Sequence, residues 1–590
     1  MKRHIILGIS ESHNATATLL IDNKIVCVIS EERLSRQKNQ WGLPLKAIAY
    51  MLGQYSVRPE DVDRVVLSFE NPFIPLHDAP VIKGEYWLNK LARTAGPLIK
   101  DTMDIIGYYI PPLFDIYKFS YDKIYKDLLW DKMRRSHCND IEKSTGISAR
   151  KITAIEHHLS HAYSVLYAFR SPDPKLIFVA DGIGDSACAT LYSVSDGAEP
   201  SVIASTPNGI SLAYLYGIIT GYLGMKKWEH EYKVMGLAPY ADPEGVKKTY
   251  EILKKIIWLD ENALTFKSHT HAEFYHYYLA KHLAGHRFDW IAGAAQKLVE
   301  DLLAQWIRAA VKKTGIRTVL LAGGVFMNIK ANQILSELDE VEHLYIMPSG
   351  ADESTAIGAA YYGYHAECRQ QNAACDPQPL NDIYLGNSYT DEEIADAIAG
   401  YQTAFQSRKC DDIEKEVAGL LADNKIVGRF KGRMEFGARA LGNRSILANP
   451  SNKDLVQIIN KKIKQRDFWM PFACTVLKER ENDYLLNPKK TESPFMMLGF
   501  NTTDAGMKQL GAAIHPYDKT VRPQILTEQV NPSYYRLIKY FEEITGIGAI
   551  LNTSFNLHGE PIVCSPFDAL RTFELSDLDY LALGQYLVHK

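Results

Sequence analysis

The chain has 590 residues, of which 46% are hydrophobic, and its formal net charge is −4. At about 150 residues per domain, this length can bury more than one hydrophobic core and predicts roughly two to four globular domains. The slightly acidic balance excludes an overall basic field for nucleic acid or an anionic membrane, although a local basic pocket is compatible with it. We therefore expect small-molecule ligands and no nucleic-acid or membrane partner.

The eight cysteines contain no Cys-x-x-Cys pair. This spacing predicts neither a zinc knuckle nor a disulfide framework, so a reducing cytoplasm is the expected location. No apolar run reaches the roughly 20 residues that are needed to cross a bilayer.

The chain begins with three short β-prone runs at residues 5–9, 16–21 and 24–30, which predict a three-stranded antiparallel opening. A similar pattern returns at residues 176–181 and 187–194, where two apolar runs flank a polar turn that contains glycine. Two such openings in one region indicate a duplicated fold.

Between the two openings, residues 74–135 are rich in aromatic side chains. Such a stripe at helical spacing is most often part of a core or of a capping helix pair. We interpret most of the segment in this way, with an acceptor pocket as the alternative for some of its rings.

Two histidines, His157 and His161, lie four residues apart and fall on one face of a helix, where their rings can share a metal ion. The chain later supplies Asp181 after a buried strand and Asp352 in a glycine-rich turn. The pair alone is equally compatible with core histidines, because the adjacent glutamate of zinc proteases is missing. Together with the two carboxylates, it predicts metal-assisted chemistry.

Residues 318–328 predict a buried strand that enters the Gly323–Gly324 turn and then a helix. Two residues without side chains allow a nucleotide phosphate to approach backbone N–H groups at a helix start. A second turn of small residues follows at 348–360. The two turns together favour a nucleotide site.

The composition changes after residue 365, and residues 366–385 are interpreted as a linker between a domain at 1–365 and another at 386–590. In the second domain we expect a helix at 411–422 and a strand at 426–430. The glycine-rich segment that follows carries Arg433, Arg439 and Arg444. More cations come from further along the chain, namely Lys464, Arg466 and Arg522. Converging guanidinium groups would form an oxyanion pocket, and separate surface cations are the alternative.

These motifs, in this order, resemble the O-carbamoyltransferases that modify nodulation factors, antibiotics and related natural products. The resemblance covers nearly the whole chain. It includes the His13 loop, the Glu31–Arg33 segment with Lys38, residues 157–161, 231–240, 323–324, 439–445 and 552–556, and Asp181 and Asp352.

The resemblance implies an α/β protein with a duplicated N-terminal domain of the actin and hexokinase superfamily and a C-terminal YrdC-like domain. It also implies a reaction in two steps. Carbamoyl phosphate and ATP first give carbamoyl adenylate and pyrophosphate, and the carbamoyl group is then transferred to a hydroxyl of a small-molecule alcohol. Magnesium on the ATP phosphates is expected.

The roles of individual residues follow from the same resemblance. The implied metal ligands are His157, His161, Asp181 and Asp352, with iron as the family's favoured ion; Fe²⁺, Mn²⁺ and Zn²⁺ all suit this donor set and stay open. His13 is implied as the general base for the acceptor hydroxyl. The full catalytic set is His13, Lys38, Arg439, Lys464, Arg522 and Ser554. The nucleotide-binding and cofactor-binding set is Gly323, Gly324, Asn328, Glu231, Lys233, Arg439, Arg444, Lys464, Arg466, Asn552 and Ser554.

Two residues depart from the family pattern. Asn14 stands where many relatives have aspartate, and Met470 stands where many have arginine, so one phosphate contact is absent or comes from another residue such as Arg466. The competing functions are a tRNA threonylcarbamoyl-type transferase, a small-molecule kinase on the same superfamily fold and a nucleotide-binding scaffold. The sequence leaves the acceptor alcohol and the oligomeric state open, with a homodimer among the alternatives.

Overall fold

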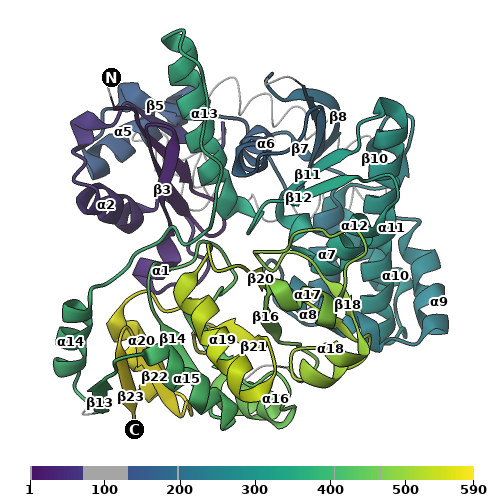
Figure 1. Cartoon of the computed structure of the whole chain (residues 1–590). Coiled ribbons are helices and arrows are strands. Elements are labelled where there is room, and N and C mark those ends of the chain that lie inside the picture. Colours follow the sequence, from purple (N-terminus) through teal and green to yellow (C-terminus); the bar gives the residue numbers. More distant parts are fainter. Residues whose placement is uncertain (1–2, 71–129, 196–197, 404, 465–466) are drawn as a thin grey trace, which may run out of the picture.

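The computed structural model describes residues 3–70, 130–195, 198–403, 405–464 and 467–590 (Figure 1). Most of the aromatic-rich segment predicted at 74–135 lies outside these residues, and so does Arg466. The end of that segment is described and forms the start of helix α5 (Trp130–Thr145). Among the described helices, none combines the length and apolar character that a membrane crossing requires.

The first sheet has five strands and contains the predicted antiparallel opening. Strand β1 pairs antiparallel with β2 and parallel with β4, and β2 pairs antiparallel with β3. The strand order is β3 (Lys24–Ser30), β2 (Thr16–Ile21), β1 (Ile5–Ser10), β4 (Arg64–Leu67) and β5 (Ile152–Ala154).

The second sheet repeats this topology. Strand β6 pairs antiparallel with β7 and parallel with β11, as β1 does with β2 and β4. The strand order is β12 (His343–Ile346), β11 (Thr318–Ala322), β6 (Lys175–Ala180), β7 (Ala187–Val194) and β8 (Ser201–Pro207). Strands β1, β6 and β11 are buried along their whole length, as apolar runs without polar alternation require.

Two helices lie between the sheets and bring the functional segments together. Helix α13 (Thr355–Gln370) packs on β1 and on α6 (His157–Ala168). The crossing of the two helices is so close that a Cβ on Gly358 would lie 1.7 Å from the backbone oxygen of Ser160. Glycine is therefore required at this position, and the start of α13 is held beside the histidine-bearing face of α6.

The other helices of this part surround the two sheets. They are α1 (Glu31–Ser35), α2 (Leu45–Gln54), α7 (Leu212–Tyr222), α8 (Glu231–Leu237), α9 (Pro243–Leu253), α10 (Tyr275–His282), α11 (Phe288–Thr314) and α12 (Ile329–Glu337). A two-stranded sheet of β9 (Ile257–Asp260) and β10 (Thr265–Ser268) completes it.

The later part of the chain, green to yellow in Figure 1, is built on an eight-stranded sheet. Its order is β13 (Gln406–Lys409), β23 (Tyr586–His589), β22 (Tyr580–Leu583), β14 (Val427–Phe430), β15 (Arg444–Ala448), β21 (Ala549–Ser554), β16 (Ala473–Leu477) and β20 (Pro523–Leu526). The strands β17 (Leu485–Leu486), β18 (Phe500–Thr502) and β19 (Thr520–Val521) form a small additional sheet.

The helices of this part are α14 (Asp391–Ala399), α15 (Ile413–Ala422), α16 (Asp454–Ile458), α17 (Glu481–Tyr484), α18 (Asp504–Gln509), α19 (Pro532–Thr545) and α20 (Pro566–Glu574). Helix α15 and strand β14 confirm the predicted helix at 411–422 and strand at 426–430 to within two residues. A π-helical segment, Ile459–Lys464, follows α16 and ends at one of the predicted catalytic residues.

The predicted linker begins later than expected, because α13 continues to Gln370. The chain after it runs along the first part of the molecule: the N–H of Gln378 donates to the Asn23 oxygen at 2.7 Å, and the N–H of Val28 donates to the Leu385 oxygen at 3.1 Å. The segment is thus held by backbone bonds, and the division into two domains at residue 386 stays a prediction.

Candidate active site

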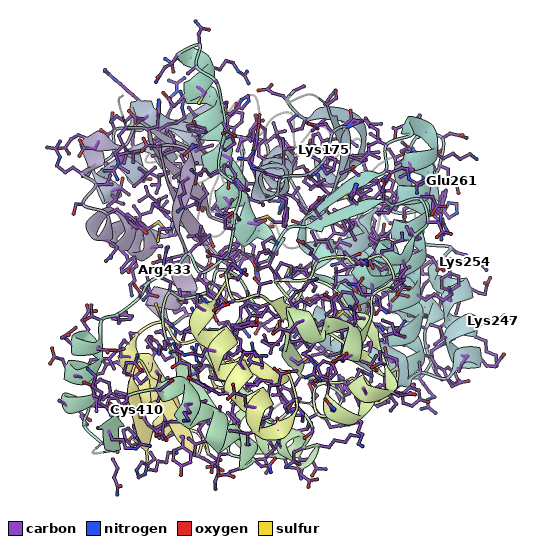
Figure 2. All side chains as sticks on the ribbon, in the orientation of Figure 1. Lys175, Lys247, Lys254, Glu261, Cys410 and Arg433 are labelled. Carbon is purple, nitrogen blue, oxygen red and sulfur yellow. The ribbon has the colours of Figure 1, made fainter. Side chains whose placement is uncertain are left out.

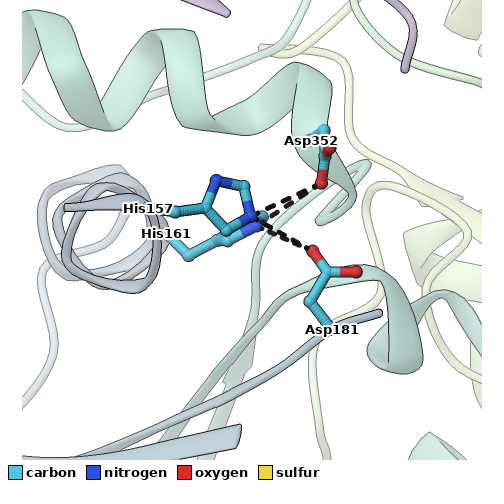
Figure 3. Close-up of side chains that lie close together, drawn as sticks. All are labelled: His157, His161, Asp181 and Asp352. Carbon is cyan, nitrogen blue, oxygen red and sulfur yellow. Dashed lines mark hydrogen bonds and ion pairs between the residues drawn. The ribbon is translucent and has the colours of Figure 1, made fainter. Parts of the chain in front are cut away.

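The first functional cluster joins two histidines from α6 to two carboxylates. Glu156 caps the helix by accepting a bond from the Leu159 N–H at 2.7 Å, which places His157 and His161 in its first turns. Asp181 follows the end of β6, and Asp352 begins the short helix η6 (Asp352–Ser354). Figure 3 shows the two rings directed toward the two carboxylates, so the predicted set of four is brought together.

The dimensions of this cluster fit one metal ion. One ligand atom from each of the four residues lies within 4.8 Å of the others. From His161 Nε2 to Asp181 Oδ2 the distance is 3.0 Å, and from His157 Nε2 it is 3.6 Å to the same oxygen and 3.7 Å to Asp352 Oδ1. Two ligands at about 2.1 Å from one ion lie about 3.0–3.5 Å apart, so the cluster needs little rearrangement.

The hydrogen bonding of the rings supports the same interpretation. His157 is fully buried, and within the described part of the chain neither of its ring nitrogens has a hydrogen-bond partner. Buried polar atoms without partners are uncommon, and a bound ion would supply the missing contact. Burial disfavours the charged ring of His161, but the Asp181 and Asp352 carboxylates raise its pKa to about 9.

The predicted glycine turn supports this cluster. A Cβ on Gly324 would lie 2.9 Å from Asp181 Oδ1, so the turn leaves room for the carboxylate, and the N–H of Gly323 donates to the Gly350 oxygen at 2.8 Å. Asn328 caps α12 by accepting from the Ala331 N–H. In the described residues, neither these glycines nor Asn328 lines the cavity described next.

A cavity of about 360 Å³ lies where the two parts of the chain meet. All six predicted catalytic residues line it. They are His13 and Lys38 from the first part and Arg439, Lys464, Arg522 and Ser554 from the second. The structure thus joins in one cavity residues that the sequence assigns to two separate domains.

His13 and Lys38 reach the cavity from neighbouring loops. His13 lies in the turn between β1 and β2, and its ring packs edge-on against Trp41 with 5.6 Å between centroids. The N–H of Ala15 donates to the Gln40 oxygen at 2.8 Å, which holds the loop after α1 against this turn. Lys38 Nζ lies 3.6 Å from Glu229 Oε1, so it is loosely paired.

Arg439 enters the cavity from the glycine-rich loop. Glu435 organises this loop, since one of its oxygens accepts from the N–H groups of Leu441, Asn443 and Arg444 at 2.6–3.1 Å. Burial lowers the pKa of Arg439, and the Glu353 carboxylate partly offsets this effect. Among the residues that the structure describes, Nε of Arg439 has no hydrogen-bond partner. The side chain is therefore suited to an anionic ligand.

Lys464 and Ser554 form a polar corner at the end of β21. Lys464 Nζ donates to Asn556 Oδ1 at 2.7 Å, to Ser554 Oγ at 3.2 Å and to the Ser554 backbone oxygen. Ser554 Oγ in turn donates to Asn556 Oδ1 at 2.7 Å. The lysine is thus fixed in place at the C-terminal end of a π-helical segment, a conformation often found at functional sites.

Among the described residues, Arg444 does not line the cavity, and its predicted role in nucleotide binding stays a prediction. Its side chain is fully buried, it lies 3.7 Å above the Phe430 ring, and it donates to the backbone oxygens of Lys431 and Gly432. Burial lowers its pKa to about 10. The guanidinium group therefore holds the glycine-rich loop from inside and does not face the cavity.

Three other residues that were predicted to bind the nucleotide also do not line the cavity in the described structure. Asn552 is buried and donates to the Ala440 oxygen at 3.1 Å. Glu231 accepts from the Trp228 N–H, and Lys233 Nζ lies 3.0 Å from Asp467 Oδ2 across the boundary between the two parts. These side chains support the walls of the cavity.

Several cavity-lining residues were not predicted. They include Arg33, Lys330, His515, Asp518 and His558, and Met470 also lines the cavity. Lys330 Nζ lies 2.7 Å from Asp518 Oδ2 and so ties α12 to the later part of the chain. Arg33 lies in the Glu31–Arg33 motif, but the motif gave it no role. The cavity lining comes together only through contacts between distant segments.

The fold and the site define a class of protein with a four-residue cluster that could hold a metal ion and a cavity lined by several cations. Comparison with known proteins identifies the kind of enzyme. Residues 5–361 match the family described as "Carbamoyltransferase N-terminus", and residues 418–590 match "Carbamoyltransferase C-terminus". The chain belongs to the carbamoyltransferase family, and it is a carbamoyltransferase.

Individual relatives align over most of the chain. An uncharacterized protein of Synechocystis sp. is 30% identical, covering 99% of this chain and 96% of that protein. Nodulation protein NolNO of Sinorhizobium fredii is 29% identical over 98% of this chain and 79% of its own length. Nodulation protein NolO of Bradyrhizobium diazoefficiens is 32% identical over 74% of this chain and 79% of its own.

Proposed function

We propose that the protein is an ATP-dependent O-carbamoyltransferase that acts on a hydroxyl of a small natural product. The observation that carries this proposal is the single cavity that contains His13, Lys38, Arg439, Lys464, Arg522 and Ser554. A histidine that can accept a proton lies there beside several cations that can bind phosphate groups.

In the first step, water hydrolyses carbamoyl phosphate to carbamate and inorganic phosphate. A carbamate oxygen then attacks the α-phosphorus of ATP, and pyrophosphate leaves as carbamoyl adenylate forms. Arg439, Lys464 and Arg522 place positive charge where the phosphate oxygens gain negative charge. Lys464 is held in place before the reaction by its hydrogen bonds to Ser554 and Asn556. Mg²⁺ accompanies ATP as part of the substrate.

In the second step, the acceptor oxygen bonds to the carbamoyl carbon and the bond from that carbon to the AMP oxygen breaks. His13 takes the hydroxyl proton. The shared cavity supports direct transfer, because a mixed anhydride that never leaves the protein is not exposed to bulk water.

An ion held by His157, His161, Asp181 and Asp352 would supply Lewis-acid charge for a phosphate or carbonyl oxygen. Two observations support such an ion: the ring nitrogens of His157 have no hydrogen-bond partner among the described residues, and the four side chains lie close together. We propose Fe²⁺, with Mn²⁺ and Zn²⁺ as alternatives that this donor set also accepts.

The repeated sheet topology supports the assignment of residues 1–365 to the actin and hexokinase superfamily, and residues 386–590 are proposed to form a YrdC-like domain. The nodulation proteins among the relatives favour a glycan or another small-molecule alcohol as acceptor. A threonylcarbamoyl-type transferase would instead require tRNA, and a kinase would release ADP. The release of pyrophosphate and AMP from ATP, dependent on carbamoyl phosphate, tests the proposal.

A further inference from the structure

Arg33 is a buried arginine at the boundary between the two parts of the molecule. It lies in α1, directly after β3, and only 4% of its surface is exposed. Its Nη2 donates to the Gly437 backbone oxygen at 2.6 Å, and its Nε lies 3.4 Å from Glu32 Oε1. One side of the guanidinium group is therefore used to hold the loop that carries Arg439.

The other side of the guanidinium group is not used. Across the described ranges, Nη1 of Arg33 has no hydrogen-bond partner, although the side chain is buried and lines the cavity. A buried, charged N–H group without an acceptor is costly, so its partner is expected to come from a ligand.

The neighbouring charges indicate what this ligand is. Glu32, the acidic residue beside Arg33, already accepts from the Asn39 N–H at 2.9 Å and faces Arg33 Nε. Lys38 and Arg439 line the same cavity as Arg33 and add two more positive charges. A group with several negatively charged oxygens suits a cavity lined by these three cations, and guanidinium donors fit phosphate oxygens in particular.

We propose that Arg33 binds a phosphate group of the substrate through Nη1 while Nη2 positions the Gly437–Arg439 loop. A residue of the first part of the chain would thereby complete the phosphate site of the second. The inference rests on the proposed function only in taking this cavity as the place where phosphate-containing substrates bind. The phosphate can belong to the nucleotide or to carbamoyl phosphate.

Three probes distinguish these sources. AMP and adenosine differ only in the nucleotide phosphate, and phosphonoacetamide is a stable analogue of carbamoyl phosphate. We expect Arg33→Met to weaken binding of AMP, phosphonoacetamide or both by about 10- to 100-fold, the range for loss of a charge-assisted hydrogen bond. Adenosine affinity, measured by calorimetry on the full chain, should not change.

Arg433 provides a matched control for a purely structural role. It too lies near the boundary between the two parts of the chain, where Figure 2 labels it. Its Nη2 donates to the Val26 oxygen at 2.7 Å and to the Leu385 oxygen at 2.9 Å. It does not line the cavity in the described structure. Arg433→Met is expected to keep the affinity for both phosphate ligands, even if its denaturation midpoint falls.

Unchanged affinity of Arg33→Met for both phosphate ligands would overturn the proposal, as would wild-type protein that binds neither. If Arg33→Met does not fold, Arg33→Lys answers the same question. Lysine keeps the charge but cannot serve Gly437 and the ligand together, so phosphate affinity should still fall by several fold; wild-type affinity would contradict the proposal. Pyrophosphate release by the wild type is measured separately, so a failure of the proposed function is distinguishable from a failure of this contact.

Discussion

The backbone N–H of Ala438 donates a hydrogen bond to Ser349 Oγ at 3.0 Å, and this bond connects the two functional regions. The same hydroxyl donates to Glu353, the neighbour of the metal-cluster residue Asp352. Ala438 directly precedes Arg439. The contact therefore links the turn that carries Asp352, a proposed metal ligand, to the loop that carries Arg439, a proposed phosphate-binding residue.

Gly437 makes this contact possible. Its φ is +87°, and a Cβ at this position would lie 2.3 Å from the Ser349 Cβ. We expect Gly437→Ala to push the loop away from Ser349, to displace Arg439 and to reduce pyrophosphate release by about 100-fold, as small displacements of catalytic groups can do.

Gly546 is the control for backbone strain alone. It also has a positive φ, +75°, but open space surrounds its missing Cβ at the end of α19. Gly546→Ala should lower the free energy of unfolding by about 1 kcal/mol and leave the reaction rate unchanged. Equal rates for the two variants would show that the Ser349 contact does not position Arg439.

The role of His13 predicts that the two half-reactions can be separated. His13→Asn should retain pyrophosphate release, because the phosphate-binding cations are unaffected. Transfer to an acceptor alcohol should fall by about 100- to 10,000-fold, the range for loss of a general base. Radiolabelled carbamoyl phosphate would follow both steps, and loss of the first step as well would refute a role confined to transfer.

Arg439 lies in the glycine-rich loop and Arg444 begins strand β15, and substitutions at the two positions are expected to have different effects. Arg439→Met removes a cation from the cavity wall, so the protein should fold normally and lose about 100-fold in pyrophosphate release. Arg444→Met leaves the backbone oxygens of Lys431 and Gly432 without their donor, and the free energy of unfolding should fall by about 3 kcal/mol. Denaturation by urea and a pyrophosphate assay on both variants would test this contrast, and equal stabilities would contradict it.

Local patterns predicted the elements of this fold better than its cavity. The spacing of apolar and polar residues along short segments predicted strands β1 to β3 and the helical placement of His157 and His161, and the structure contains these elements. Nothing local distinguishes Arg439, which lines the cavity, from Arg444, which is buried away from it, because each arginine follows a glycine by two residues. The burial of Arg33 beside Gly437 depends on segments 404 residues apart, and a single sequence does not specify how such segments pack.

Removal of one ligand from the proposed metal site is expected to deplete the bound ion. His157→Ala removes one of four ligands and should leave the protein, prepared in the presence of Fe²⁺, with less than about a tenth of its metal content. His158 on the same helix is the control: its Nδ1 pairs with Thr190 Oγ1 at 2.8 Å, so His158→Asn should keep the ion. Elemental analysis by mass spectrometry measures both, and full occupancy in His157→Ala would mean that the histidine pair is structural.

We propose that the protein cleaves ATP to pyrophosphate and AMP and that this cleavage is coupled to carbamoyl transfer. This proposal is tested most directly by incubating the wild-type protein with ATP, Mg²⁺ and Fe²⁺, with and without carbamoyl phosphate, and identifying the products by chromatography. We predict pyrophosphate only when carbamoyl phosphate is present, and AMP in equal amount once an acceptor alcohol or water takes the carbamoyl group. Formation of ADP, or nucleotide cleavage that does not depend on carbamoyl phosphate, would contradict the account.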